Sequence, residues 1–215
     1  MDENKNRENF FSEDFSFEKN NESDNKNNKN KKEKSAVQEI VEWVACIGIA
    51  FVVAFVLKTY VMTIAVVDGP SMENTLHHAE RLITWKMGYE PEHGDVIIFQ
   101  PKKSTSENPV YYVKRIIATE HDDVVIDYNQ NAVFVNGKKV EEDYIKDDVM
   151  LPRGSNIDNG IIKVVVPEDH VYVLGDNRNN SEDSRSSAVA CVPHEDIEGK
   201  VIFRSWPLNK MGTVE

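Results

Sequence analysis

The sequence predicts a mainly β protein, with an antiparallel β-sheet domain behind one N-terminal transmembrane helix and a disordered N-terminal tail. A long apolar segment stands near the N-terminus, and the residues before it are almost all polar. The residues after it form short β-branched runs separated by turn-forming residues. We therefore expect a disordered cytoplasmic tail at 1–36, a transmembrane anchor at 37–61 and a β-rich domain at 62–215.

The composition narrows the possible partners. The chain has 215 residues and a net charge of −12. Because nucleic-acid binding needs a basic footprint, we expect no DNA or RNA partner. Cys46 and Cys191 are the two cysteines, and their placement predicts no disulfide and fits no zinc pattern. No metal and no organic cofactor is expected.

The first 36 residues are rich in Asn, Lys and Glu, and such a segment buries too little apolar surface to offset its ordering entropy. Its aromatic residues are scattered, although they could form a small docking motif: Phe10, Phe11, Phe15 and Phe17.

The apolar segment predicts a membrane anchor. Its uncharged part, Trp43 to Leu57, is shorter as a helix than the roughly 30 Å hydrocarbon core, but 37–61 is long enough. A buried core helix and a cleaved signal peptide are the alternatives, and the long polar stretch before the segment argues against cleavage. Lysines cluster before the segment, so the positive-inside rule places the N-terminus in the cytoplasm and 62–215 outside.

The remaining chain is expected to form antiparallel strands. Two of them, 124–128 and 132–135, flank an Asn-rich turn and predict a hairpin. Residues 102–108 and 141–160 are polar and predict loops. The other expected strands are 62–67, 81–85, 96–99, 111–118, 161–166 and 171–174.

Two residues could form a catalytic pair. Ser71 follows a Gly-Pro pair, where most serines are simply turn residues. Lys114 lies in an apolar strand whose alternation places Tyr112 and Lys114 on one face and Arg115 on the other, so one of the two adjacent cations should point inward. A buried lysine has a lowered pKa and can act as a general base, whereas an edge-strand lysine would stay solvated.

A third polar stretch, 175–185, follows a predicted strand. It is dense in short polar side chains that can bond their own backbone, which is typical of a rigid loop. A calcium loop is disfavoured because Arg178 stands where an oxygen ligand would be needed.

Taken together, these stretches resemble the bacterial type I signal peptidases. The resemblance covers roughly residues 37–206 and rests on the anchor and four motifs in the family's order: GPSMENTL at 69–76, HGDVIIF at 93–99, YVKRIIA at 112–118 and GDNRNNSEDSR at 175–185. It implies a membrane-anchored serine endopeptidase that removes signal peptides from exported preproteins. It would act on the outer face of a bacterial cytoplasmic membrane.

The resemblance also implies residue roles. Ser71 would be the nucleophile and Lys114 the general base. Met72 would form part of the floor of the site, and Ser181 would hydrogen-bond and orient the lysine. The remaining supporting residues would form two ion pairs, Asp183 with Arg185 and Asp176 with Arg115.

The strands before Ser71 and before Lys114 would bind the backbone of an extended substrate. Shallow pockets for small side chains would suit an Ala-x-Ala cleavage signal. The candidate substrate-binding residues are Ile64, Val66, Gly69, Tyr112 and Val113.

The sequence departs from the family's usual residues at Asn74, often a proline, at His93, commonly an arginine, and at two further positions that could affect the site. Gly69 stands where some members carry a serine or threonine whose hydroxyl serves the oxyanion hole, so the hole would rest mainly on the Ser71 backbone N–H. Ala190 stands where the family usually has a glycine.

Two other functions stay open. One is a processing peptidase dedicated to a single secreted substrate. The other is a catalytically silent, membrane-anchored β module that binds peptides, which the combination of Ser71, Lys114 and Ser181 argues against. The histidine-dependent archaeal and endoplasmic-reticulum branch is disfavoured by Lys114 within YVKR.

Overall fold

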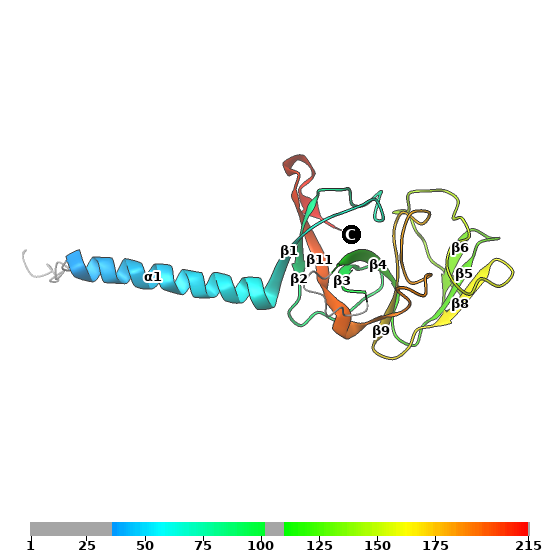
Figure 1. Cartoon of the computed structure of the whole chain (residues 1–215), viewed down its shortest axis with the longest axis horizontal. Coiled ribbons are helices and arrows are strands. Elements are labelled where there is room, and N and C mark those ends of the chain that lie inside the picture. Colours follow the sequence, from blue (N-terminus) through cyan, green and yellow to red (C-terminus); the bar gives the residue numbers. More distant parts are fainter. Residues whose placement is uncertain (1–35, 102–109, 215) are drawn as a thin grey trace, which may run out of the picture. The chain divides into compact units, whose positions relative to one another are not determined.

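A computed structural model describes residues 36–101 and 110–214 of the chain (Figure 1). The predicted loop at 102–108 and the predicted disordered tail up to residue 35 lie outside the described residues, and Ala36, the last residue of that predicted tail, belongs to the helix. Helix α1 spans Ala36–Val56 and is followed by a π-helical turn at Leu57–Val61. The stretch Ala36–Val61 is long and apolar enough to cross a membrane, and α1 contains no buried residue.

The larger sheet is antiparallel throughout, as predicted. Its strand order is β1-β2-β11-β3-β4-β9-β10, with β12 paired to β11. Within the described residues, β1 is therefore an edge strand. The strands are β1 Met62–Val66, β2 Arg81–Trp85, β3 Val96–Phe99, β4 Tyr112–Ala118, β9 His170–Leu174, β10 Val192–Pro193, β11 Ile197–Trp206 and β12 Gly212–Thr213.

A second sheet of four strands has the order β7-β6-β5-β8. The turn between β6 and β7 is Asn136-Gly137, and both residues have positive φ, as a tight hairpin turn of this type requires. The strands are β5 Asp123–Asp127, β6 Ala132–Val135, β7 Lys138–Lys139 and β8 Ile161–Val165. Two short 3₁₀ turns, His194–Asp196 and Leu208–Lys210, complete the elements.

Each predicted strand forms, with ends that differ by at most one residue. The sequence did not reveal β11, the ten-residue strand that lies between β2 and β3. Its first half, Ile197 to Lys200, contains two charged residues and a glycine, and these hide the apolar pattern.

Separate apolar clusters hold the elements together. One of them lies beneath the turn that contains Ser71 and includes the fully buried Met72 and Leu76 together with Leu82, Ile98 and Val201. A second packs β4 and β9 against the smaller sheet, and a third joins β3, β4 and β9 to β10. The β4 strand contributes to more than one cluster, so its backbone is fixed on both faces.

Candidate active site

Ser71 and Lys114 meet although they lie 43 positions apart in the sequence. The Lys114 Nζ lies 2.8 Å from the Ser71 Oγ, within hydrogen-bonding distance. A second hydrogen bond, also 2.8 Å, runs from Nζ to the Val113 carbonyl. The Tyr112 ring centroid is 5.2 Å from Nζ, on the same face of β4 as Lys114. The amine is therefore aimed at the serine hydroxyl.

The turn carrying Ser71 is fixed on both sides. The Val67 N–H donates to the Glu80 carbonyl and the Ala79 N–H donates to the Val67 carbonyl, both at 2.9 Å, which closes the base of the loop. Within it, Met72 is buried in the apolar cluster and also lines the cavity over Ser71, and the Leu76 N–H donates to the Met72 carbonyl at 2.7 Å. Ser71 is thus presented by a closed loop with an apolar anchor.

Lys114 and Arg115 are both buried, at 3% and 2% exposure, which corrects the expectation that only one of the two cations would point inward. Burial lowers the pKa of Lys114 from 10.5 to about 8, against the opposing influence of Asp183, Asp176 and Glu182, which raises it. Arg115 stays buried because it has a carboxylate partner on the other face of the strand. Strand alternation predicted the two faces correctly but missed that both are covered.

The partner of Arg115 is Asp176, as predicted. Its Nε and Nη2 donate to the two carboxylate oxygens at 3.0 and 2.9 Å. The Thr75 hydroxyl also donates to Asp176, and the Thr75 carbonyl accepts from Arg204 at 3.1 Å. This cluster ties the Ser71 loop to β4, to β9 and to β11. The sequence gave no signal for Thr75 or Arg204, because neither contact is local.

The loop at 175–185 supports the turn that carries Ser71. The predicted pair of Asp183 and Arg185 is buried and joined at 2.8 Å. Burial raises the pKa of the Asp183 carboxyl, but hydrogen bonds from Arg185 and its charge more than offset this, so the pKa lies below its usual value. Asn177, which was not predicted, donates from its backbone N–H to the Ser71 carbonyl and from its side chain to the Pro70 carbonyl, both at 3.1 Å.

Ser181 is buried next to this pair, but it does not hydrogen-bond Lys114. Its Oγ lies instead near the Asp183 carboxylate and contributes to the lowered pKa of that group. The second bond of the Lys114 amine goes instead to the carbonyl of its neighbour Val113. The expected orienting bond from Ser181 is thus absent from this arrangement, and the main chain of β4 takes its place.

A cavity of about 250 Å³ opens over Ser71 and Lys114. Four of the five predicted substrate-binding residues line it, namely Val66, Gly69, Tyr112 and Val113. Ile64 does not line it, although it lies on the same face of β1 as Val66, and its side chain is 70% exposed. The remaining lining residues are Ala65, Val67, Asp68, Pro70, Met72, Ile98, Tyr111 and Glu182.

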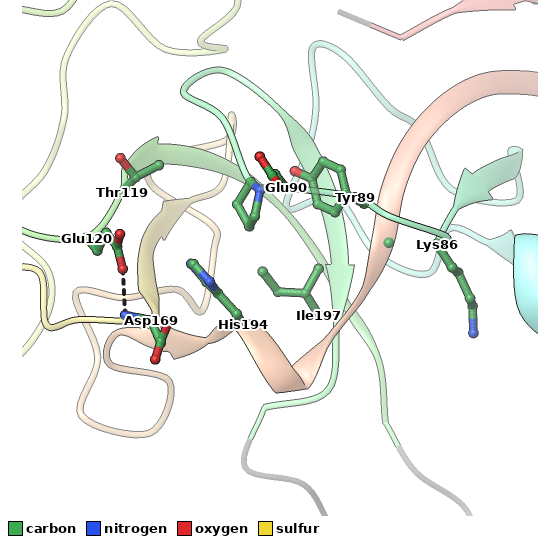
Figure 2. Close-up of a pocket in the computed structure, with 10 residues that line it drawn as sticks. Lys86, Tyr89, Glu90, Thr119, Glu120, Asp169, His194 and Ile197 are labelled. Carbon is green, nitrogen blue, oxygen red and sulfur yellow. Dashed lines mark hydrogen bonds between the residues drawn. The ribbon is translucent and has the colours of Figure 1, made fainter.

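A larger cavity of about 430 Å³ shares none of these residues. Figure 2 shows His194 between Glu120 and Ile197, and the Glu120 carboxylate accepts the Asp169 N–H at 2.9 Å. Among the described residues, no serine or cysteine lines this cavity, and its one lysine, Lys86, is ion-paired with Glu198. In the described part of the chain, no group of three or more His, Cys, Asp or Glu side chains could hold a metal ion.

A model of the family described as signal peptidase, peptidase S26, matches residues 40–206. The chain belongs to this signal peptidase family. It is 34% identical over 187 residues to signal peptidase IB of Staphylococcus aureus (strain COL), covering 80% of this chain and 93% of that protein. It is 34% identical over 168 residues to probable signal peptidase I-2 of Synechocystis sp., covering 76% and 72%.

Among solved structures, the chain is similar to a signal peptidase I from Enterococcus faecalis V583. The identity is 25%, the TM-score is 0.41, and the match covers 53% of this chain and 97% of that one.

The departures at Gly69 and Ala190 from the signal peptidase pattern have backbone correlates. Gly69 has φ +91°, a conformation that side chains rarely adopt, so this backbone favours glycine over a hydroxyl-bearing residue. Its N–H donates to His78 Nδ1 at 3.4 Å. Ala190 has φ +57°, a left-handed conformation that glycine adopts more readily than alanine.

Proposed function

We propose that this protein is a membrane-anchored serine endopeptidase that removes signal peptides from preproteins, with Ser71 as nucleophile and Lys114 as general base. Membership of the signal peptidase family supports the reaction class. The single observation that carries the residue roles is the 2.8 Å contact between Ser71 Oγ and a buried lysine amine. A serine hydroxyl becomes a useful nucleophile at neutral pH when a base lies within this distance.

The chemistry follows from this contact. Neutral Lys114 removes the Ser71 proton as Oγ attacks the scissile carbonyl carbon, and the resulting ammonium then gives that proton to the leaving amine. The acyl-enzyme ester is hydrolysed by a water that Lys114 deprotonates. Because Gly69 has no hydroxyl, the developing oxyanion would be bound mainly by the Ser71 backbone N–H.

Two strand edges beside the cavity suit an extended substrate. β1 is an edge strand in the described residues, and β9 pairs with β4 only from Arg115 onward, whereas Tyr112 to Lys114 pair with β3 alone. Residues of both edges, including Val66 and Val113, line the cavity. A peptide that binds between them by backbone hydrogen bonds would present its scissile carbonyl to Ser71.

The small, partly apolar cavity suits small side chains, such as those of an Ala-x-Ala cleavage signal. The stretch Ala36–Val61 serves as the anchor, in contact with membrane lipid. Lysines before this helix favour a cytoplasmic N-terminus, with the peptidase domain on the outer face of a bacterial cytoplasmic membrane. Protease treatment of intact spheroplasts tests this orientation, which requires residues 62–215 to be digested and an N-terminal epitope to be protected.

The residue roles are tested by cleavage of a preprotein with the detergent-solubilised full chain. Ser71→Ala and Lys114→Ala are each expected to lower the rate by at least ~10⁴-fold, as loss of members of such catalytic sets does. Lys163→Ala is the matched control because Lys163 is exposed on β8. If folded Lys114→Ala still cleaves at the control rate, the base is another group and the assignment fails.

A further inference from the structure

The cavity around Ser71 carries two carboxylates. Asp68 lies in the chain leading to Ser71, and Glu182 lies in the supporting loop. Glu182 stands between Ser181 and Asp183, which are both buried, so its backbone position is fixed while its side chain is exposed at the cavity. The Ser186 hydroxyl donates to Glu182 Oε1 at 2.9 Å and restrains the carboxylate.

Of these two carboxylates, Glu182 is the better placed to act on a bound substrate. The Asp68 side chain is 95% exposed, so water screens its charge, and no described cation lies within ion-pair distance of Glu182. Among the described residues, Lys114 is the one cationic side chain that lines the cavity, and it is directed to Ser71 and Val113. A substrate bound over Ser71 therefore meets the restrained carboxylate of Glu182 at the wall of the cavity.

We infer that Glu182 is a specificity-determining residue, which favours substrates with a basic side chain close to the scissile bond and disfavours acidic ones. This inference rests on the proposed peptidase function. A carboxylate beside a bound peptide attracts a lysine side chain and repels a glutamate, and both effects change the selection ratio in the same direction. Because Glu182 is exposed, water and salt screen it, and the expected preference is moderate, on the order of 5–10-fold.

The test uses the detergent-solubilised full chain and one parent peptide with a cleavable Ala-x-Ala site. The Ala-x-Ala signal occupies the three positions before the scissile bond. Lys, Gln or Glu is placed in turn at each of the three positions before this signal and at each of the three positions after the bond. For each enzyme, kcat/KM is measured for every peptide, and the Lys-to-Glu ratio is compared between enzymes. Taking the ratio on one enzyme cancels any change in the reactivity of Lys114, whose pKa Glu182 also raises.

The variants are Glu182→Gln, Glu182→Lys and the control Glu90→Gln. Glu90 is also an exposed carboxylate but lines the other cavity, so it matches the change in net charge (Figure 2). At one or more positions, the wild type and Glu90→Gln should prefer Lys by about 5–10-fold at low salt. Glu182→Gln should bring this ratio close to one, and Glu182→Lys should invert it.

A ratio that stays the same in Glu182→Gln, or a wild type with no charge preference at any position, overturns the inference. The Gln peptide separates this failure from failure of the peptidase function. If the wild type cleaves the Gln peptide, the proposed function stands whatever the charge ratios are. If it cleaves none of the peptides, the proposed function fails and the inference falls with it.

Discussion

The pKa of the Lys114 amine reflects two opposing effects. Burial among apolar neighbours penalises the ammonium form, while Asp183, Asp176 and Glu182 favour it. Two of these carboxylates, Asp183 and Asp176, are themselves paired with arginines, which weakens their influence on the lysine. The balance leaves a pKa of about 8, low enough for an appreciable neutral fraction near physiological pH.

This balance predicts the pH profile of cleavage. Because the free enzyme needs a neutral amine, kcat/KM should rise with pH and level off above an apparent pKa of about 8. Lys114→Arg should be inactive across this range, since a guanidinium keeps its proton. The measurement is kcat/KM for a neutral peptide between pH 6 and 10. A midpoint near 10.5, the ordinary value for lysine, would contradict the proposed burial effect.

The same burial should reduce stability. A pKa lowered from 10.5 to about 8 means that the folded state binds this proton less tightly than the unfolded state does. At about 1.4 kcal/mol per pKa unit, the resulting loss of folding stability is up to ~3 kcal/mol. This loss is fully present below pH 8 and fades as the pH rises to 10.5. Lys114→Met, which keeps the side-chain length, should therefore raise the free energy of unfolding at pH 7 by about 1–3 kcal/mol.

Urea denaturation of both proteins at pH 7 and at pH 10 checks this prediction. The difference in the free energy of unfolding between the two proteins should shrink at pH 10. The other titrating groups are common to both proteins, so their contributions to this difference cancel. A variant that is less stable than the wild type at pH 7 would show that the two hydrogen bonds of Lys114 outweigh its desolvation.

The loop at 175–185 holds the nucleophile through its main chain as much as through its charges. Gly175 lies where Ser71, Ser181 and β9 come together, and a β-carbon there would stand 2.2 Å from the Ser181 Oγ and 2.5 Å from the Ser71 carbonyl oxygen. Such distances leave no room for a side chain. The glycine is thus required by close approach of two loops, because its φ does not lie in the left-handed region.

Gly175→Ala should consequently push the Ser71 carbonyl away from Asn177 and misplace the hydroxyl. We expect kcat/KM to fall by at least ~10²-fold, since misplacement by about 1 Å costs this much. Gly137→Ala is the control variant, because it also replaces a glycine but nothing lies within 4 Å of the added β-carbon. Its expected effect is on stability alone. Equal kcat/KM in folded Gly175→Ala and in the wild type would show that the loops can separate without cost.

The buried pair of Arg115 and Asp176 makes a different contribution. Asp176→Asn would leave the Arg115 charge without its carboxylate, and breaking one side of a buried pair costs ~3–5 kcal/mol. The double variant Asp176→Asn with Arg115→Met should recover part of that loss because no buried charge remains. Thermal unfolding of the wild type, Asp176→Asn, Arg115→Met and the double variant measures this coupling, and additive losses would mean that the pair is not coupled.

Strand positions could be predicted from the sequence because β-branched runs between turn residues are a local signal. β4 illustrates both the success and the limit, since its alternation was correct and its start differed by one residue, but the burial of both Lys114 and Arg115 was not predicted. That burial depends on residues supplied by distant segments. The contacts of Thr75, Asn177 and Arg204 have the same origin, and for this reason none of them was predicted.

The site as a whole is built within residues 47–215, one of the two compact units of the chain. Ser71, Lys114 and the supporting loop all lie there, as do both cavity-lining strand edges. The π-helical turn Leu57–Val61 belongs to the same unit, since the Lys86 N–H donates to the Val61 carbonyl at 2.9 Å and Val61 is buried. The chemistry should therefore not depend on the residues before Leu57.

A chain that begins at Leu57 should cleave a soluble peptide with kcat/KM within about threefold of the full chain, because every contact described around Ser71 is retained. It should lose most of its activity on a preprotein embedded in lipid vesicles. Without the anchor, the enzyme must find each substrate by diffusion from solution rather than on a shared membrane. This lowers the effective concentration of the enzyme at its substrate by ~10²–10⁴-fold. The two assays on the same preparations separate the roles. Equal loss on peptide and preprotein would mean that the anchor segment is needed for the site itself, and equal retention on both would mean that it contributes nothing to encounter with the substrate.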